Sequence, residues 1–487
     1  MRISFIDSTG WPLPNIALAY LIASIEKTNH KPMLIDCFLK KSKEEYILKK
    51  IKEQSPDIVG FSTMTSALEK NFNIAQAIKK EFPGLLTIFG GIHPTLLPEE
   101  TLNNPYVDAV CIGEGEKAIV ELLDCLEEKK ELNVKGIWYK RDGQIIKNEL
   151  RVLEQNLDSL PFPNLDYWDM DLYLKIFPKP TGGIYILASR GCPFECSFCS
   201  QKALKEILTT NNSLYYRARS ANNIIAEAKL NIEKYKNRGL KAFLFADDTF
   251  GLNRSQLDEF TELYIKEGIY KIYPWGCQTR ADIINEEWVR KAKKSGCFLV
   301  ELGLENSREE VRIKKYNKKI TDEQFKKVVK WLKEAGIIYN FNILIGSFGE
   351  TPAEIWRNVK ESYALGPLFL YISPYIPHPK IELRAQHGDS IIKETNLLGG
   401  LPRIETGALS IKKLNYIVWR IRLIQIFTKL KIGFRLKKIT FIFDLLKYVL
   451  NYNGQRQISF LHPLGLIHMF DRKILDYYKE KHFISKI

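Results

Sequence analysis

Short apolar runs alternate with helical segments from residue 1 to about residue 124. The runs are RISFID, PMLID, DIVGFST, LLTIFGG and DAVCIGEG, and segments such as EEYILKKIKEQSP and KNFNIAQAIKKEFP separate them. Strands that alternate with helices at this spacing predict a parallel sheet with right-handed crossovers, which is a doubly wound α/β domain. Such sheets bind ligands at the carboxyl ends of their strands. Polar and glycine residues follow the runs there, at residues 8–10, 62–66, 90–95 and 113–116.

A second alternation begins after a connecting region. GIWYK and QIIKN flank Asp142 and Gly143, which predicts a hairpin, and the prolines of DSLPFPNLDYWD predict an ordered linker over residues 150–180. Six further runs follow: IYILAS, AFLFADD, YPWGCQT, FLVELGLE, YNFNILIG and LFLYISP. They predict a partial or complete β/α barrel of the TIM type over residues 181–380, with its chemistry on loops at the carboxyl ends of the strands.

The alternation is lost after about residue 381, where apolar and basic residues mix in helical segments. The sequence therefore predicts an α/β protein with a Rossmann-like domain over residues 1–149 and the linker over 150–180. The barrel follows over 181–380, and a basic helical domain over 381–487 ends the chain.

The composition excludes several classes of protein. The chain has 487 residues, of which 45% are hydrophobic and 26% charged, so a mostly disordered chain is excluded and two to four domains are expected. No run of 18 uncharged apolar residues occurs, and the segment MRISFID lacks the features of a signal peptide. We expect a cytoplasmic protein.

The net charge of +15 is concentrated near the carboxyl end. Residues 401–487 hold 17 Lys and Arg against 5 Asp and Glu, so 12 of the 15 surplus charges lie there. Basic and aromatic residues interleave at Trp419, Arg420, Arg422, Phe427 and Lys429, but no nucleic-acid motif accompanies them, and we expect no nucleic-acid partner. Peripheral contact with an anionic membrane and ordinary packing with snorkelling Lys and Arg both stay open.

Three of the eight cysteines form one C-x3-C-x2-C group, Cys192, Cys196 and Cys199, directly after the first barrel strand. Three thiolates on one loop can bind three irons of a cubane cluster and leave the fourth iron without a protein ligand from this loop. A structural zinc site would need a fourth ligand nearby, and no histidine occurs between His93 and His378. A zinc site completed by a distant residue is the alternative.

This loop, with Phe198 just before its last cysteine, resembles that of the radical SAM superfamily. The resemblance implies a 4Fe-4S cluster whose open iron binds S-adenosylmethionine, and reductive cleavage of that cofactor to a 5'-deoxyadenosyl radical. It further implies an electron donor such as flavodoxin or ferredoxin. Other matches to the family follow in order at the predicted strand ends and would contact S-adenosylmethionine: Asp247, Asp248, Arg280, Glu305, Gly346 and Glu350. A helix cap at Asp248 or Thr249 is the competing interpretation of that segment.

Together with the first domain, the chain resembles the cobalamin-binding subgroup of this superfamily. The resemblance implies a doubly wound domain that receives the nucleotide tail of cobalamin. It assigns five residues to that site: Ser62, Thr63, Gly90, Gly91 and Thr95. The GEGE segment at 113–116 matches the subgroup as well. None of the seven histidines has an Asp two residues before it, so no histidine of the D-x-H-x-x-G type is expected to coordinate cobalt. The absence of this histidine is also consistent with a domain that keeps the fold but no longer binds cobalamin.

Two further sites have competing interpretations. Tyr216, Arg217 and Arg219 could hold a carboxylate or phosphate of the substrate, or form a solvated, partly structural basic pair. Cys277 could face the cofactors as a hydrogen donor, and a buried inert thiol is the favoured interpretation.

We therefore predict a cobalamin-dependent radical SAM methyltransferase that methylates an unactivated carbon of a small-molecule or lipid-like substrate. The first alternative is the same radical used for cyclisation, rearrangement or carbon-carbon coupling without methyl transfer. A non-catalytic corrinoid or iron-sulfur sensor is an alternative from another class.

Overall fold

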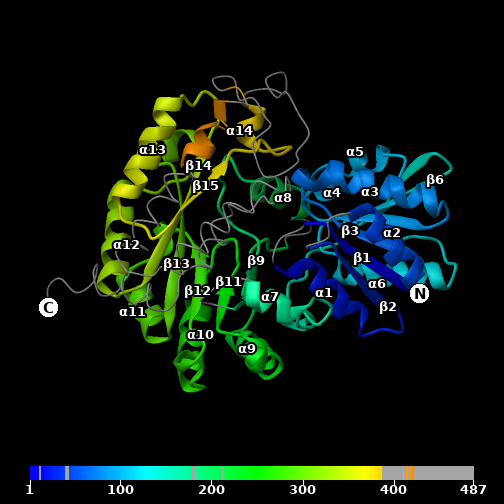
Figure 1. Cartoon of the computed structure of the whole chain (residues 1–487), viewed down its shortest axis with the longest axis horizontal. Coiled ribbons are helices and arrows are strands. Elements are labelled where there is room, and N and C mark those ends of the chain that lie inside the picture. Colours follow the sequence, from blue (N-terminus) through cyan, green and yellow to red (C-terminus); the bar gives the residue numbers. More distant parts are fainter. Residues whose placement is uncertain are drawn as a thin grey trace.

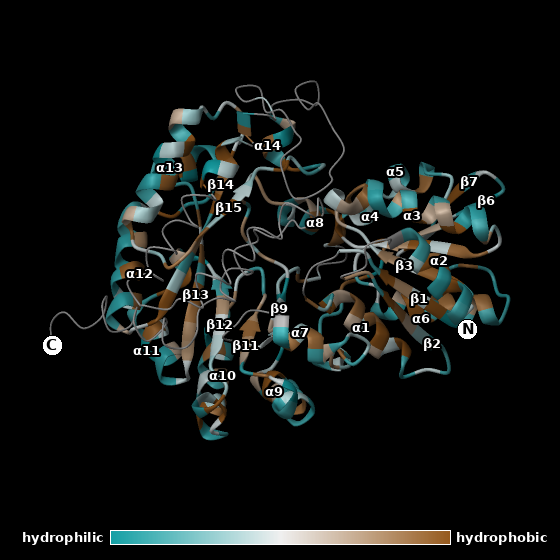
Figure 2. Ribbon diagram, in the orientation of Figure 1, coloured by the Kyte–Doolittle hydropathy of each residue, from teal (hydrophilic) through white to brown (hydrophobic). Residues whose placement is uncertain are grey.

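The computed structural model describes residues 1–9, 13–38, 43–176, 182–209, 213–386, 410, 413–414 and 416–421. Two parallel sheets lie side by side, one from the amino-terminal part of the chain and one from the middle (Figure 1). Figure 2 colours much of the two sheets as hydrophobic and the surrounding helices largely as hydrophilic.

The first sheet has seven strands in the order β2-β1-β3-β4-β5-β6-β7. Its strands are β1 (Arg2–Asp7), β2 (Lys31–Asp36), β3 (Ile58–Ser62), β4 (Leu86–Gly90), β5 (Ala109–Cys111), β6 (Ile137–Arg141) and β7 (Gln144–Lys147). The first five are parallel, whereas β6 and β7 pair antiparallel as the predicted hairpin.

Helices cover both faces of the first sheet, which confirms the doubly wound prediction. They are α1 (Ile16–Ile25), α2 (Lys43–Gln54), α3 (Leu68–Glu81), α4 (Ile92–Leu96), α5 (Pro98–Asn103) and α6 (Glu116–Glu127). Side chains alternate along a strand, so Phe5 packs with α1 and α6 in one buried cluster, whereas Ile6 packs with α2 and α3 in another.

The second sheet has six parallel strands in the order β15-β14-β13-β12-β11-β8. They are β8 (Gly183–Ile186), β11 (Ala242–Phe245), β12 (Trp275–Thr279), β13 (Cys297–Glu305), β14 (Ile338–Ile345) and β15 (Leu370–Pro374). The connecting helices are α9 (Ala221–Tyr235), α10 (Arg254–Lys266), α11 (Glu286–Lys294), α12 (Asp322–Glu334) and α13 (Pro352–Ala364). The edge strands β8 and β15 do not pair with each other in this described sheet, so it is a half-barrel.

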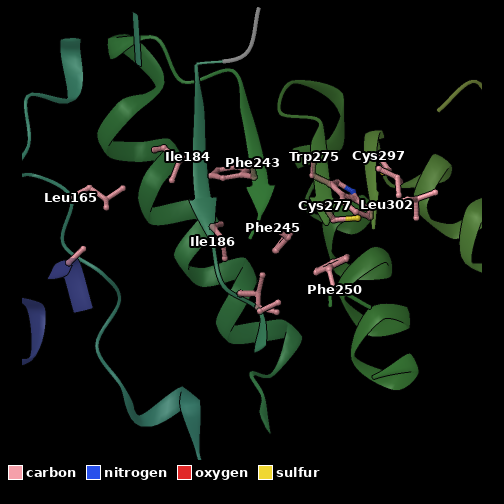
Figure 3. Packing of buried hydrophobic residues seen from close by; sticks show 14 of the residues in the cluster. Leu165, Ile184, Ile186, Phe243, Phe245, Phe250, Trp275, Cys277, Cys297 and Leu302 are labelled. Carbon is pink, nitrogen blue, oxygen red and sulfur yellow. The ribbon is translucent and has the colours of Figure 1, made fainter. Parts of the chain in front are cut away.

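Aromatic and aliphatic side chains fill the space between this sheet and its helices (Figure 3). Phe243 and Phe245 of β11 lie next to Trp275 of β12, and the ring centroids of Phe245 and Trp275 are 5.8 Å apart. Cys277 belongs to the same buried cluster and is 3% exposed. The expectation that Cys277 faces the cofactors is therefore wrong, because its register points it towards the helices. The favoured interpretation, a buried thiol, is confirmed.

The predicted linker packs against the first sheet. Trp168 Nε1 donates to Asp7 Oδ2 at 3.2 Å, and in α7 (Met170–Ile176) the hydroxyl of Tyr173 donates to Asp36 Oδ2 at 2.9 Å. Both carboxylates lie at the carboxyl ends of their strands, so the linker is ordered by specific contacts.

Little of the predicted carboxyl-terminal domain is described. Leu414, Ile417, Val418 and Ile421 are buried against the half-barrel, whereas Trp419 is 55% exposed. Arg420 lies over the ring of Trp356 at 5.4 Å. The rest of the basic region, with Arg422, Phe427 and Lys429, lies outside the described residues. Within the described part of the chain, no helix is both long and apolar enough to cross a bilayer.

Candidate active site

The three clustered cysteines lie on one loop between β9 (Ser189–Arg190) and α8 (Gln201–Leu208). Cys196 is buried, and Cys192 and Cys199 are partly exposed. Two hydrogen bonds of Ser197 anchor the loop. Ser197 N donates to Tyr316 O at 3.0 Å, and Ser197 Oγ donates to Lys315 O at 2.6 Å. Phe198 packs edge-on against Tyr316 at 5.3 Å. The loop is thus fixed by the segment that follows β13.

Burial disfavours the thiolate form of two cysteines of the loop. Burial raises the pKa of Cys192, and it raises that of Cys199 to about 12, so these thiols need a metal to hold their thiolates. Among the described residues, no three His, Cys, Asp or Glu side chains converge on one ion.

Arg280, predicted from the end of β12, lies against the cysteine loop. Its Nη1 donates to Cys196 Sγ at 3.3 Å, and its guanidinium stacks on the ring of Phe194 at 3.6 Å. Asp282 accepts hydrogen bonds from Nε and Nη2 at 3.0 and 2.8 Å. The arginine is therefore oriented by a carboxylate and an aromatic ring, with one donor directed at the sulfur.

Asp247 and Asp248 follow β11 and border the cavity described below. Asp247 accepts hydrogen bonds from Ala188 N at 3.1 Å and Ser189 Oγ at 2.5 Å, and burial raises its pKa to about 6. Asp248 Oδ1 accepts from Gln201 Nε2 at 3.0 Å. The competing interpretation as a helix cap is wrong, because α10 begins at Arg254 and Asn253 caps it.

Glu305, at the end of β13, is buried in the left-handed region with φ 61°. Its Oε1 accepts from Lys318 Nζ at 2.9 Å. An L residue held at positive φ stores backbone strain, and this ion pair is the contact that fixes the side chain.

Glu350 turns back onto its own loop. Gly346 N and Ser347 N donate to Glu350 Oε2 at 2.6 and 3.2 Å, and burial raises the pKa of the carboxyl to about 7. Gly346 has φ +74°, and a Cβ there would lie 2.7 Å from the side chain of Leu414. Glu350 therefore shapes the loop after β14.

The residues expected to bind cobalamin divide into two groups. Ser62, Gly90 and Gly91 line the cavity. Thr63 and Thr95 instead form hydrogen bonds within the protein. Thr63 Oγ1 accepts from Asn71 Nδ2 at 2.9 Å. Thr95 Oγ1 donates to Gly91 O at 2.8 Å and accepts from Gly113 N at 3.0 Å. The two threonines shape the strand ends that form the cavity wall. Gly91 cannot be larger, because its φ is +100° and a Cβ would lie 2.9 Å from the backbone of Thr63.

A cavity of about 510 Å³ lies between the carboxyl ends of the two sheets. Its deep end is an apolar slot between the first sheet and helices α1 and α6, lined by Phe5, Gly60, Ile88, Leu18 and Ile119. The other end carries polar groups of the second domain: Ser189, Arg190, Asp247 and Asp248. No histidine is among the described residues that line it. One cavity therefore borders members of both sets of predicted site residues: Ser62, Gly90 and Gly91 in the first domain, and Asp247 and Asp248 in the second.

Sequence reasoning missed the contacts that join the two domains at this cavity. Glu114 Oε1 accepts from Arg190 Nη1 at 3.0 Å and from Arg217 Nη1 at 2.9 Å, and Arg190 Nη2 donates to Glu116 Oε1 at 2.5 Å. Arg190 and Arg217 face each other across the ribbon of β9 and β10 (Arg217–Ala218). The GEGE segment at residues 113–116 drew attention to these glutamates, but the sequence does not indicate which residues pair with them.

The structure favours the structural part of the second interpretation of Arg217 and Arg219, but neither arginine is solvated. Arg217 is 6% exposed and bonds Glu114, and Arg219 is 4% exposed and pairs with Glu227 of α9. Neither guanidinium is solvated or open to a substrate.

Comparisons with known proteins agree with this arrangement. Residues 5–123 match the B12 binding domain, and residues 186–361 match the radical SAM superfamily. An uncharacterized methyltransferase of Pyrococcus horikoshii is 32% identical over 380 residues, which are 78% of each chain. The chain belongs to the cobalamin-binding subgroup of the radical SAM superfamily.

Other relatives of this radical SAM protein extend the comparison. The anaerobic magnesium-protoporphyrin IX monomethyl ester cyclase of Rubrivivax gelatinosus is 27% identical, over 78% of this chain and 67% of the cyclase. The structure of the radical S-adenosylmethionine methyltransferase TsrM from Kitasatospora setae, with cobalamin and a 4Fe-4S cluster bound, shares the fold at 17% identity. Its TM-score is 0.61, over 77% of this chain and 72% of TsrM.

The subgroup's cofactors are a 4Fe-4S cluster, S-adenosylmethionine and cobalamin, and the residues present fit them. Three thiols lie on one loop beside an arginine donor. The cavity offers an apolar slot at glycine-rich strand ends. There the nucleotide tail of cobalamin could approach the backbone closely. The predicted family, fold and cofactors are thus confirmed. The roles of individual residues and the domain boundaries stay predictions.

Proposed function

We propose that this radical SAM protein methylates an unactivated carbon of a small molecule. The observation that carries the proposal is the single cavity that joins the slot of the first domain to Asp247 and Asp248 beside the cysteine loop. A methyl donor in the slot and a radical source at the loop would then act on one substrate. The methyltransferase name of the Pyrococcus horikoshii relative supports it.

When bound, the cofactors supply the radical and the methyl group; the chain's residues position and shield them. We propose Cys192, Cys196 and Cys199 as the cluster ligands. Asp247 and Asp248 would face the amino group of S-adenosylmethionine, and Arg280 would steady the cluster through Cys196.

Three other predicted site residues would support the site indirectly, because each fixes the conformation of a loop. Glu305 and its partner Lys318 shape the end of β13. Glu350 keeps the loop at Gly346 closed on itself, and Phe198 packs the cysteine loop on Tyr316. On the cobalamin side, Ser62, Gly90 and Gly91 would contact the cofactor, while Thr63 and Thr95 would hold the strand ends in place.

The test is the reaction product. Reconstituted protein with reductant and S-adenosylmethionine should form 5'-deoxyadenosine, and its product should gain the mass of one methyl group. Absence of 5'-deoxyadenosine would sink radical chemistry and leave a sensor. A loss of two hydrogens without a methyl gain would favour cyclisation, which the cyclase relatives make the second candidate.

We also propose a cytoplasmic location and a small reductant such as flavodoxin or ferredoxin. All eight cysteines are free, which supports a reducing compartment. Peripheral membrane contact through residues 381–487 remains part of the proposal. Salt-sensitive sedimentation with anionic vesicles, compared with a chain ending at Ile381, tests it; equal behaviour of the two chains would remove it.

A further inference from the structure

The inner face of the second sheet carries a layer of polar side chains well inside the half-barrel. The register aligns Gln278 of β12 with Glu301 of β13, and Glu301 with Asn340 of β14. Their strand neighbours Cys277, Val300 and Phe341 belong to the core beneath the helices, so the polar side chains point to the inner side.

Hydrogen bonds join this layer across four strands. Gln278 Nε2 donates to Glu301 Oε2 at 3.0 Å, and Asn340 Nδ2 donates to the hydroxyl oxygen of Tyr371 at 3.2 Å. Tyr371 of β15 and Asn340 also bond the Glu301 carboxyl, and Tyr185 of β8 lies close enough to feel its charge. Five strands therefore send polar groups to one place.

Gln278 marks the exposed side of the layer, whose other hydrogen-bonded members, Glu301, Asn340 and Tyr371, are buried. Gln278 is exposed although it lies within β12, Ser373 of β15 is exposed, and Asn342 of β14 is half-buried. A side chain in the middle of a central strand stays exposed only where the face in front of it is not packed. The Glu301 carboxyl, 7% exposed, lies directly behind Gln278.

Glu301 has no cationic partner in the part of the chain that is described. The groups that act on it are neutral hydrogen-bond donors, and burial raises its pKa. A cation beside Glu301 would stabilise the ionised form of this carboxyl. The nearest basic groups at the strand ends are engaged, since Arg280 pairs with Asp282 and Lys318 with Glu305. Among the described residues, the inner face thus offers one carboxyl and no opposite charge to balance it.

We propose that this layer recognises a substrate that carries an amino group, with Glu301 as the anionic anchor. The inference rests on the proposed function and names the substrate class. An ammonium group would supply the missing cation through charge-assisted hydrogen bonds. A hydrocarbon substrate would leave the polar layer desolvated without partners, and a phosphate or carboxylate would face a like charge in a poorly screened site.

The distance between Glu301 and the end of its strand also suits a substrate that reaches the cofactors. Glu301 lies four residues before Glu305 at the strand end, which is roughly 13 Å along an extended strand. A substrate anchored at Glu301 would thus reach the cofactors with a carbon remote from its amino group. Binding energy from a remote group can position the reacting carbon.

The test uses a metabolite extract of the cells that encode this chain. The extract is separated by cation exchange at neutral pH into a retained fraction, which holds the amines, and a flow-through of neutral and anionic compounds. A portion of the retained fraction is treated with acetic anhydride, which converts amines to uncharged amides. The full-length, reconstituted protein is then assayed with each fraction for 5'-deoxyadenosine and for new product masses.

The inference expects a product from the retained fraction alone and its loss after acetylation. Glu301→Gln, which keeps the shape and one acceptor, should raise KM for the retained fraction roughly 10- to 100-fold. Glu334→Gln, an exposed change on α12, is the matched control and should behave as wild type.

A product from the flow-through, a product that survives acetylation, or an unchanged KM for Glu301→Gln would overturn the inference. A product from the retained fraction that shows no methyl gain would contradict methyl transfer and still support amine recognition. The two failures are therefore distinguishable.

Discussion

Glu114 of the first domain accepts hydrogen bonds from both Arg190 and Arg217 of the second. Arg190 lies two residues before Cys192, and it also pairs with Glu116 and stacks on Tyr20. Glu114, Glu116, Arg190 and Tyr20 border the cavity between the domains. The wall of the predicted cobalamin site and the start of the cysteine loop are thus joined by one charge network.

Removal of the central carboxylate should weaken the fold. Glu114→Gln leaves two largely buried guanidiniums short of a counter-charge, and we expect a loss of roughly 3 kcal/mol in the free energy of unfolding, seen as a lower urea midpoint. Glu99→Gln breaks an exposed pair with Lys147 and should cost less than about 1 kcal/mol. Equal losses for the two variants would contradict a structural role for the network.

The cysteine loop should hold the only cluster. Cys196→Ala removes the buried ligand, so the visible absorbance of the cluster and the formation of 5'-deoxyadenosine should both be abolished. Cys277→Ala is the matched control, because this thiol is packed in the core away from the loop. That variant should keep the absorbance. Loss of the cluster in both variants would point to general misfolding.

Cobalamin binding should depend on Gly91. A Cβ at this position would meet the backbone of Thr63 and sit at the cavity wall, so Gly91→Ala should weaken cobalamin binding at least roughly 10-fold in an absorption titration. Gly143, in the hairpin turn, also has a positive φ, but a Cβ added there would have no atom within 4 Å. Gly143→Ala is therefore the matched variant. It serves as the control and should bind cobalamin normally; similar weakening in both would exclude a local effect.

The stability of the cluster-free protein should depend on pH through Glu350. Burial raises its folded pKa from 4.5 to about 7, so the folded state holds the proton more tightly than the unfolded state. The resulting stabilisation is fully present below about pH 4.5 and is lost as the pH rises through about 7. Wild type should therefore lose about 2–3 kcal/mol between about pH 5 and pH 8 relative to Glu350→Gln. Parallel pH curves for the two proteins would refute this.

Local patterns predicted much of the fold. Each apolar run became a strand of the expected sheet, and the hairpin formed at Asp142 and Gly143. The cysteine loop was readable because its ligands lie within eight residues. Whether the barrel would be complete was left open, since closure depends on contacts between β8 and β15 that no local pattern encodes.

Contacts between distant residues could not be predicted. Arg217 and Glu114 are 103 residues apart, so the sequence indicates a substrate-binding or partly structural arginine and does not identify its carboxylate partner. Thr95 looked like a ligand residue, yet its hydroxyl bridges β4 and β5. In each case the partner decides the role, and the partner is set by the tertiary fold.

The central claim is that one chain carries the cobalamin and the cluster together. The most direct test is the iron and cobalt content of protein purified without oxygen in the presence of cobalamin, read with its absorption spectrum. We predict about one cobalt for four irons, with the cobalt lost in Gly91→Ala and the iron lost in Cys196→Ala. Iron without cobalt in the wild-type protein would contradict the claim.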